Sequence, residues 1–261
     1  MTNAHMRTAR RRSVCANCRI RAAEFQLICA SFDGGTQDVL EHPRPARTRG
    51  SAAGRPGTEG ATSPRDQLFR QNDTADRAAL IITGRCRVLW QGERGRTTYL
   101  ATRRDGDLVG EVALLDGGRR NATVRALTDT YVRWYSREAF EALLTNHSAI
   151  LRKLLNSANS RLKESDHQQI AITSAPAQVR LARLLLRLAE AEGVSTDGDT
   201  EIRDVSRQDL GDWTGMGRDA ASRGITRLQE RGLIGTTRAR RRIVITDLAG
   251  LRRHALASAD D

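Results

Sequence analysis

Short apolar runs separated by turn residues fill the chain from Leu68 to Tyr135. Residues of the Asn, Asp and Gly type lie between the runs, as in the stretch Gln91–Gly95. Closely spaced short strands with such turns are typical of an all-β sandwich or barrel. The predicted strands are Leu68–Phe69, Ala78–Ile82, Arg85–Trp90, Thr97–Thr102, Leu108–Val109, Ala122–Leu127 and Tyr131–Tyr135.

A helical pattern replaces these runs after Ser136, a candidate N-cap because its hydroxyl can accept a hydrogen bond from an early helix amide. Further along, positions recur at alternating steps of four and three, the spacing of a coiled-coil seam. The seam positions are Leu151, Leu155, Ala158, Leu162, Ser165, Gln169 and Ile172. They predict a long dimerisation helix, in which the polar Ser165 and Gln169 are candidates for fixing the register.

The C-terminal part begins with Pro176, which ends the seam helix, and with an amphipathic helix that runs to about Glu192. Ser206 and Asp209 then form a capping-box pattern at the start of a new helix. The elements that follow are a helix over Arg207–Thr214, a turn over Gly215–Gly217, a helix over Arg218–Arg231 closed by Gly232, and two strands, Leu233–Ile234 and Arg242–Thr246. This order predicts a winged helix-turn-helix.

The first 60 residues differ from the rest of the chain. The stretch His42–Pro64 is rich in Pro, Gly, Ser, Ala and Arg and has no periodic apolar positions, which is typical of a disordered segment or linker. An over-extended start codon is the alternative explanation. We therefore expect an α+β protein with four parts: a disordered extension over 1–60, an all-β domain over 61–147 of the sandwich or barrel class that includes the β-roll (jelly roll), the dimerisation helix over 148–174 and the winged helix-turn-helix over 175–261.

Composition adds a strong positive charge. The 261 residues carry a formal net charge of +12 and a pI near 10.8, which favour nucleic acid, an anionic membrane surface or a phosphorylated ligand as partner. Biased base composition of the gene is the alternative, because arginines are spread along the chain and the only lysines are Lys153 and Lys163. No apolar run approaches the roughly 18 residues of a membrane span. No apolar segment follows the basic start either, so we expect a cytoplasmic protein.

The first constellation that carries chemistry begins at Gly110 and reads G-E-V-A-L-L-D-G-G-R-R-N-A-T-V. Glu111 offers two acceptor oxygens for hydroxyl groups, and Arg120 offers a planar donor fork for phosphate. The backbone amides of Asn121 and Ala122 form a candidate anion-binding nest. A carboxylate and a guanidinium so close together in a β domain suit a small sugar phosphate.

This segment resembles the phosphate-binding cassette of cyclic-nucleotide-binding domains, whose pattern is roughly G-E-x-A-L-L-x-G-x-x-R-S-A-T. The resemblance implies that Glu111 binds the ribose 2′-hydroxyl and that Arg120 binds the cyclic phosphate. Asn121 departs from the usual Ser or Ala, and Arg119 stands where Pro is common. A folded turn with Glu111 and Arg120 paired to each other, and no ligand, is the alternative. The candidate ligand-binding residues here are Gly110, Glu111, Val112, Arg120, Asn121 and Ala122.

The second constellation lies in the predicted helix-turn-helix. Four polar residues share the outer face of its second helix: Arg218, Asp219, Ser222 and Arg223. Such a helix fits the major groove, where Arg reads guanine and Asp accepts a hydrogen bond from cytosine. The apolar contact between the two helices is expected from Leu210, Trp213, Ile225 and Leu228. The start of the first helix adds the candidate DNA-binding residues Ser206, Arg207 and Gln208.

An arginine cluster, Arg238, Arg240, Arg241 and Arg242, lies at the tip of the predicted hairpin. A wing tip with this charge is suited to phosphate contacts, so Arg238, Arg240 and Arg241 join the candidate DNA-binding residues. A solvated turn is the alternative for this cluster. A winged-helix module used for protein contacts is the alternative for the whole domain.

The domain order, together with these motifs, resembles the cyclic-AMP receptor/fumarate-nitrate regulator (CRP/FNR) family over about residues 66–253. The family's recognition helix starts S-R-E-T-V-x-R, which residues 217–223 match in part. Gly217 replaces the Ser cap, Asp219 is one methylene shorter than Glu, and Gly224 stands where a β-branched core residue is usual. The resemblance also implies that Ser165 contacts the purine across the dimer, with a register-setting role as the alternative.

The cysteines Cys15, Cys18, Cys29 and Cys86 resemble the iron–sulfur ligands of the oxygen-sensing branch of this family. That branch has a shorter gap before its third cysteine, and its fourth lies near the position of Val132. Cys86 falls within a predicted strand, where a free cysteine acts as a small apolar side chain. We therefore expect no metal and no tightly bound cofactor. The chain shows no nucleophile–base arrangement and no Walker-type loop, so we do not expect an enzyme.

These patterns together predict a homodimeric, sequence-specific DNA-binding transcription regulator controlled by a cyclic nucleotide, with cyclic AMP as the expected effector. The expected partners are double-stranded DNA, the nucleotide, a second copy of the chain and RNA polymerase, but no membrane. Two alternatives stay open. One is a redox-sensing or iron–sulfur-sensing regulator of the same family, and the other is a regulatory binding module that contacts a protein instead of DNA.

Overall fold

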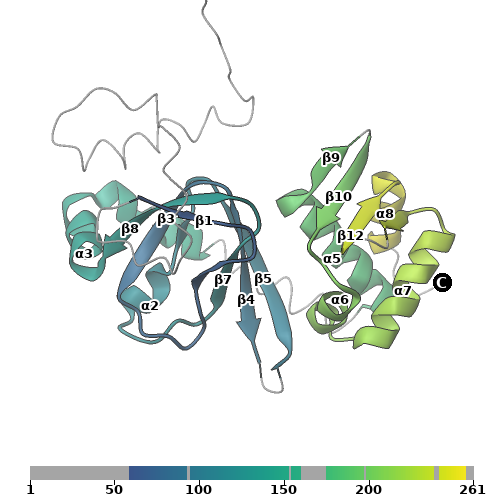
Figure 1. The fold of residues 1–261 in the computed structure, drawn as a ribbon, viewed down its shortest axis with the longest axis horizontal. Coiled ribbons are helices and arrows are strands. Elements are labelled where there is room, and N and C mark those ends of the chain that lie inside the picture. The colour runs from purple at the N-terminus through teal and green to yellow at the C-terminus, as the bar shows by residue number, and fades with distance from the viewer. Residues whose placement is uncertain are drawn as a thin grey trace, which may run out of the picture. The chain divides into compact units, whose positions relative to one another are not determined.

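The computed structural model describes residues 59–92, 95–152, 154–159, 175–196, 198–237 and 241–256. All of them fall within one unit of the chain, Pro45–Asp261. Figure 1 shows a β-rich N-terminal domain followed by a C-terminal domain of helices and a small sheet. Several expectations lie outside the described residues, namely those for Ser165, Arg238, Arg240, Cys15, Cys18, Cys29 and most of the N-terminal extension.

Two antiparallel four-stranded sheets build the described part of the N-terminal domain, and the short apolar runs predict all of their strands except β1 (Glu59–Thr62). The assignment of His42–Pro64 to a disordered segment or linker is wrong at Glu59–Thr62, because these residues form β1 by pairing with residues 130–133. One sheet has the order β1 (Glu59–Thr62), β8 (Thr130–Ser136), β3 (Arg77–Thr83) and β6 (Leu108–Val109). The other has the order β2 (Gln67–Phe69), β7 (Thr123–Ala126), β4 (Arg85–Gln91) and β5 (Thr97–Arg104). The expected boundary at residue 60 falls inside β1, because Glu59 pairs with Arg133 in the ladder and by an ion pair of 3.0 Å.

The core of this domain lies between the sheets. Phe69 and Trp134 pack edge to face, with ring centroids 5.7 Å apart. Cys86 is 0% exposed, and burial raises the pKa of its thiol to about 12, with Thr130 opposing the shift. At neutral pH this thiol stays protonated, which confirms the expectation that Cys86 acts as an apolar core residue.

The N-terminal domain contains the helices α2 (Glu111–Leu115) and α3 (Arg137–Asn146). The sequence pattern did not predict α2. Ser136 caps α3 as predicted, because its hydroxyl accepts from the Ala139 amide at 3.2 Å. Residues 148–152 and 154–159 are also helical. In this stretch the seam residues Leu151 and Leu155 are 44% and 56% exposed. The seam from Leu162 onwards lies outside the described residues.

The C-terminal domain combines four helices with one four-stranded antiparallel sheet. The helices are α5 (Ala177–Glu192), α6 (Arg207–Thr214), α7 (Arg218–Glu230) and α8 (Leu248–Leu256). The sheet has the order β11 (Ile234–Thr237), β12 (Arg242–Ile245), β10 (Asp199–Arg203) and β9 (Val194–Thr196). The predicted helix-turn-helix and wing are present. The sequence interpretation missed β9, β10 and α8, because each is short and carries little periodicity.

Gly224 has a packing role that explains its departure from the family pattern. It lies in α7, and a Cβ atom there would meet Leu181 Cδ2 of α5 at 2.8 Å. Leu181 is 0% exposed, so a branched side chain at position 224 would have to displace a packed core residue. The glycine therefore lets α7 pack closely on α5. No helix of the described residues is long and apolar enough to cross a membrane.

Candidate functional site

The cassette segment forms a tight turn into α2. Gly110 is the N-cap of α2 with φ of 79°, and a Cβ atom there would lie 2.7 Å from Phe69 Cε2 and 2.8 Å from Arg120 Nη1. A positive φ together with this close approach requires glycine. Glu111, the first residue of α2, is 5% exposed. The turn thus buries Glu111, and it brings the preceding residue, Gly110, into contact with Arg120.

Arg120 is 3% exposed and is held by several groups. Its Nη1 donates to the Gly110 carbonyl at 2.8 Å, and its Nη2 donates to the Arg77 carbonyl at 2.6 Å and to Asp76 Oδ1 at 3.3 Å. The guanidinium carbon also lies 4.0 Å above the Phe69 ring. Burial lowers the pKa of Arg120 and Asp76 opposes this, but an arginine stays charged at neutral pH. The structure therefore presents a fixed, buried positive charge.

The backbone of Arg120 is fixed as well. Its amide donates to the Asp73 carbonyl at 2.9 Å, and its carbonyl accepts from the Asn72 amide at 2.8 Å. Of the other predicted ligand-binding residues, Val112 and Asn121 are exposed and Ala122 is 7% exposed. The predicted ligand-binding residues from Gly110 to Ala122 therefore lie in and next to the segment between β6 and β7. Asp76 and Phe69, which support Arg120, belong to no motif, and the sequence contains no signal that could have identified them.

The predicted DNA-reading face is present on α7. Arg218, Asp219 and Arg223 are exposed and Ser222 is partly exposed. The apolar residues predicted to join α6 and α7 are all buried, namely Leu210, Trp213, Ile225 and Leu228. The outer face of α7 can therefore enter a groove without disturbing the core.

The start of α6 has a complete capping box. The Ser206 hydroxyl accepts from the Asp209 amide at 3.1 Å, and Asp209 Oδ2 accepts from the Ser206 amide at 2.7 Å. The Ser206 hydroxyl is therefore already engaged within the chain. Arg207 and Gln208 are exposed, and Gln208 Nε2 donates to Asp212 Oδ1 at 2.8 Å.

Of the predicted DNA-contacting arginines of the wing, Arg238 and Arg240 lie outside the described residues, and the phosphate contact of Arg241 stays a prediction. Arg241 binds Asp209 Oδ2 at 2.5 Å and lies 3.9 Å from Asp204, and its carbonyl accepts from the Val205 amide at 3.1 Å. Arg242 binds Glu201 at 2.7 Å, an acid that Arg203 also binds. Arg241 therefore joins the wing to α6, a role that its place in an arginine run does not reveal.

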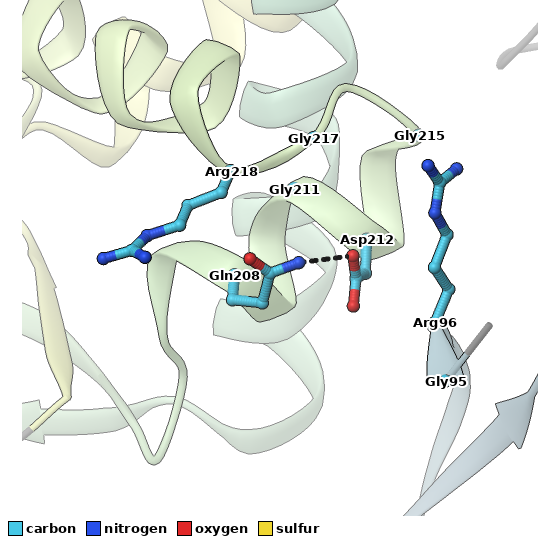
Figure 2. Close-up of a pocket in the computed structure, with 8 residues that line it drawn as sticks. All are labelled: Gly95, Arg96, Gln208, Gly211, Asp212, Gly215, Gly217 and Arg218. Atoms are coloured by element: carbon cyan, nitrogen blue, oxygen red, sulfur yellow. Dashed lines mark hydrogen bonds between the residues drawn. The ribbon is translucent and has the colours of Figure 1, made fainter.

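A cavity of about 430 Å³ lies at the helix-turn-helix. Figure 2 shows its lining, with Arg96 on the strand side and the Gln208–Asp212 hydrogen bond on α6. The lining residues are Gly95, Arg96, Gln208, Gly211, Asp212, Gly215, Gly217 and Arg218. None of them belongs to the cassette, which contains Glu111 and Arg120.

A buried ion pair joins β4 to α5. Arg87 Nη2 lies 2.7 Å from Glu192 Oε1, and both side chains are 4% exposed. Arg87 Nη1 also donates to the Asp204 carbonyl at 3.1 Å, and its guanidinium lies 5.1 Å above the Trp213 ring. The Trp213 indole donates to Thr97 Oγ1 at 3.3 Å. Charged and aromatic groups of the two domains therefore meet in one contact.

The described residues contain no cluster of three or more His, Cys, Asp and Glu side chains that could hold a metal ion. Cys86 is buried within the β core, away from solvent. Cys86 is buried and protonated, so it is unsuited to ligate an iron–sulfur cluster. Such a site would have to use Cys15, Cys18 and Cys29, which lie outside the described residues.

Comparison with known proteins identifies both domains. Residues 62–147 match the family model "Cyclic nucleotide-binding domain", and residues 179–254 match "Crp-like helix-turn-helix domain". The cAMP-activated global transcriptional regulator CRP of Salmonella typhimurium is 29% identical over 168 residues, 64% of this chain and 80% of that protein. A crystal structure of a CRP-family transcriptional regulator from Thermus thermophilus superimposes with a TM-score of 0.64 and 26% identity, over 76% of this chain and 97% of the other. The chain therefore belongs to the CRP/FNR family of transcription regulators, with an N-terminal cyclic nucleotide-binding domain and a C-terminal Crp-like helix-turn-helix domain.

Proposed function

We propose that this regulator binds a cyclic nucleotide, with cyclic AMP as the favoured effector, and that the nucleotide controls its binding to DNA. The observation that carries the proposal is the buried guanidinium of Arg120, which donates to the carbonyl of Gly110, the residue before the buried Glu111 at the N-terminus of α2. A fixed cation and a carboxylate acceptor suit a cyclic phosphate and a ribose hydroxyl. The Salmonella relative, named as cAMP-activated, supports cyclic AMP over other nucleotides.

The proposed active form is a homodimer. Leu151 and Leu155 are large, exposed apolar residues in the helical stretches 148–152 and 154–159, and the same residues of a second copy would cover them. Ser165, further along that seam, is proposed to contact the purine. Two α7 helices in such a dimer would enter successive major grooves of double-stranded DNA. RNA polymerase is the proposed protein partner, and the cytoplasm the proposed location.

Isothermal titration calorimetry tests the nucleotide site. We expect cyclic AMP to bind the wild-type protein and the Arg120→Gln variant to bind at least about tenfold more weakly, because a charge-assisted phosphate contact is lost. The matched control is Arg104→Gln, which removes an exposed arginine at the end of β5 and should leave the affinity unchanged. Absence of binding of cyclic AMP and cyclic GMP to the folded wild-type protein at millimolar concentration would refute the proposal.

Two arginine variants test the DNA interface. Arg218→Ala should cost roughly 1–3 kcal/mol at one guanine position of the operator, because a base-reading side chain is removed. Arg241→Ala should weaken binding to all sequences alike, because the wing loses its tie to Asp209. Equilibrium binding to a set of single-base operator variants measures both patterns. The same pattern for both variants would show that the assigned roles are wrong.

A further inference from the structure

The C-terminal end of α2 is held by an arginine that lies outside the cassette. Arg137, the first residue of α3, donates through Nη1 to the Leu114 carbonyl. Its Nη2 donates to the Ala75 carbonyl at 3.3 Å. These two bonds join the end of α2 to the segment that precedes β3.

This contact matters because α2 is short. Its five residues, Glu111–Leu115, contain no basic side chain in the last turn. The final carbonyls of a helix lack partners within the helix and carry a partial negative charge, and so short a helix has little stability of its own. A guanidinium from another element supplies both the missing hydrogen bond and the favourable charge.

The two ends of α2 are held in the same way. Arg120 donates to the Gly110 carbonyl at the N-terminal end and to the Arg77 carbonyl, whereas Arg137 donates to Leu114 at the C-terminal end and to Ala75. Both arginines therefore connect α2 to one segment, Ala75–Arg77. A phosphate that binds Arg120 would compete with the present acceptors of its guanidinium, the Gly110 and Arg77 carbonyls and Asp76. The contacts of Arg137 would remain.

We propose that Arg137 is a positioning residue of the nucleotide site, which keeps α2 in the place where Glu111 meets the ribose 2′-hydroxyl. This inference rests on the proposed cyclic-nucleotide function. Arg137 does not touch the ligand. It acts through α2, whose first residue is Glu111. Loss of Arg137 should therefore weaken the contribution of the 2′-hydroxyl and leave the phosphate contact of Arg120 in place.

Calorimetry with two probes, cyclic AMP and 2′-deoxy cyclic AMP, tests the inference on the full chain. The wild-type protein should prefer cyclic AMP. Arg137→Gln should bind cyclic AMP about tenfold more weakly and 2′-deoxy cyclic AMP almost unchanged, so that the preference disappears. Arg137→Lys retains a cationic donor and should restore much of the preference. Thermal unfolding of each variant shows that the comparison is made on folded protein.

The matched control is Glu141→Gln, which removes the exposed acid 4.0 Å from Arg137 and keeps both carbonyl contacts. It should bind both probes like the wild-type protein. A folded Arg137→Gln variant that retains the full preference for cyclic AMP would overturn the role of Arg137 and leave the proposed function intact. A wild-type protein that binds both probes equally would have the same consequence. A wild-type protein that binds neither probe overturns the proposed function as well.

Discussion

Glu192→Ala is expected to lower the free energy of unfolding by about 3–5 kcal/mol, because it leaves the buried Arg87 without its counter-charge. The two side chains are 2.7 Å apart and 4% exposed, so water cannot replace the lost carboxylate without a rearrangement. Arg87 would keep its hydrogen bond to the Asp204 carbonyl and its place above Trp213. These neutral contacts compensate a buried charge only in part.

The pair itself is not an efficient source of stability. Burial raises the pKa of Glu192, and Arg87 only partly opposes the shift. Arg87 Nε and Glu192 Oε2 have no hydrogen-bond partner among the described residues. Replacing both residues by apolar ones of similar volume, in the variant Arg87→Met with Glu192→Leu, should therefore recover most of the loss.

Urea denaturation followed by circular dichroism measures these differences, and Trp213 fluorescence reports on the contact itself. The control is Glu190→Ala in the same helix, which removes an exposed ion pair to Arg252 and should change the stability by less than about 1 kcal/mol. If Glu192→Ala and Glu190→Ala were equally stable, or if the double variant were the least stable of all, the buried pair would not have the role described.

Gly110→Ala should destabilise the N-terminal domain by about 2–4 kcal/mol and abolish tight nucleotide binding. The φ of 79° is unfavourable for alanine, and the added Cβ would lie 2.7 Å from the Phe69 ring and 2.8 Å from Arg120 Nη1. Either the ring or the guanidinium must move. Movement of Arg120 would break its bond to the Gly110 carbonyl and displace the charge that we propose binds the phosphate.

Gly117→Ala separates these two effects. Gly117 also has a positive φ, of 71°, but a Cβ atom there would meet no atom within 4 Å. It should cost only about 1–2 kcal/mol of backbone strain and leave nucleotide affinity nearly unchanged. Thermal unfolding and calorimetry measure both variants. Equal losses of affinity would contradict the importance of the close approach at Gly110.

Much of the local structure could be predicted from the sequence, because its signals lie close together in the chain. The short apolar runs predicted the strands of the β domain except β1, whose residues were assigned to a linker. Ser136 predicted a helix start, and Ser206 with Asp209 predicted a capping box that the structure contains. The cassette glycine and the α7 face were also recognisable, since residue type and spacing alone determine them. The matches at 62–147 and 179–254 confirm the family inferred from those motifs.

The ion pairs and the residues that support the candidate sites could not be predicted, because they depend on contacts between residues that are far apart in the sequence. Asp76 supports Arg120 from 44 positions away, and Glu192 pairs with Arg87 from 105 positions away. No local pattern distinguishes these two residues from the other acidic residues of the chain. Arg241 is a further case: its phosphate contact stays a prediction from the arginine run, and its ion pair with Asp209 follows from the fold and from no local pattern.

Selection of DNA sequences by the purified protein, with and without cyclic AMP, tests the central claim most directly. The full-length protein is incubated with a random duplex library at fixed salt, and the bound sequences are determined. With millimolar cyclic AMP, we predict enrichment of an inverted repeat whose half-sites lie about one helical turn apart, and little enrichment without the nucleotide. The same enrichment in both conditions, or none in either, would contradict a regulator whose DNA binding is controlled by a cyclic nucleotide.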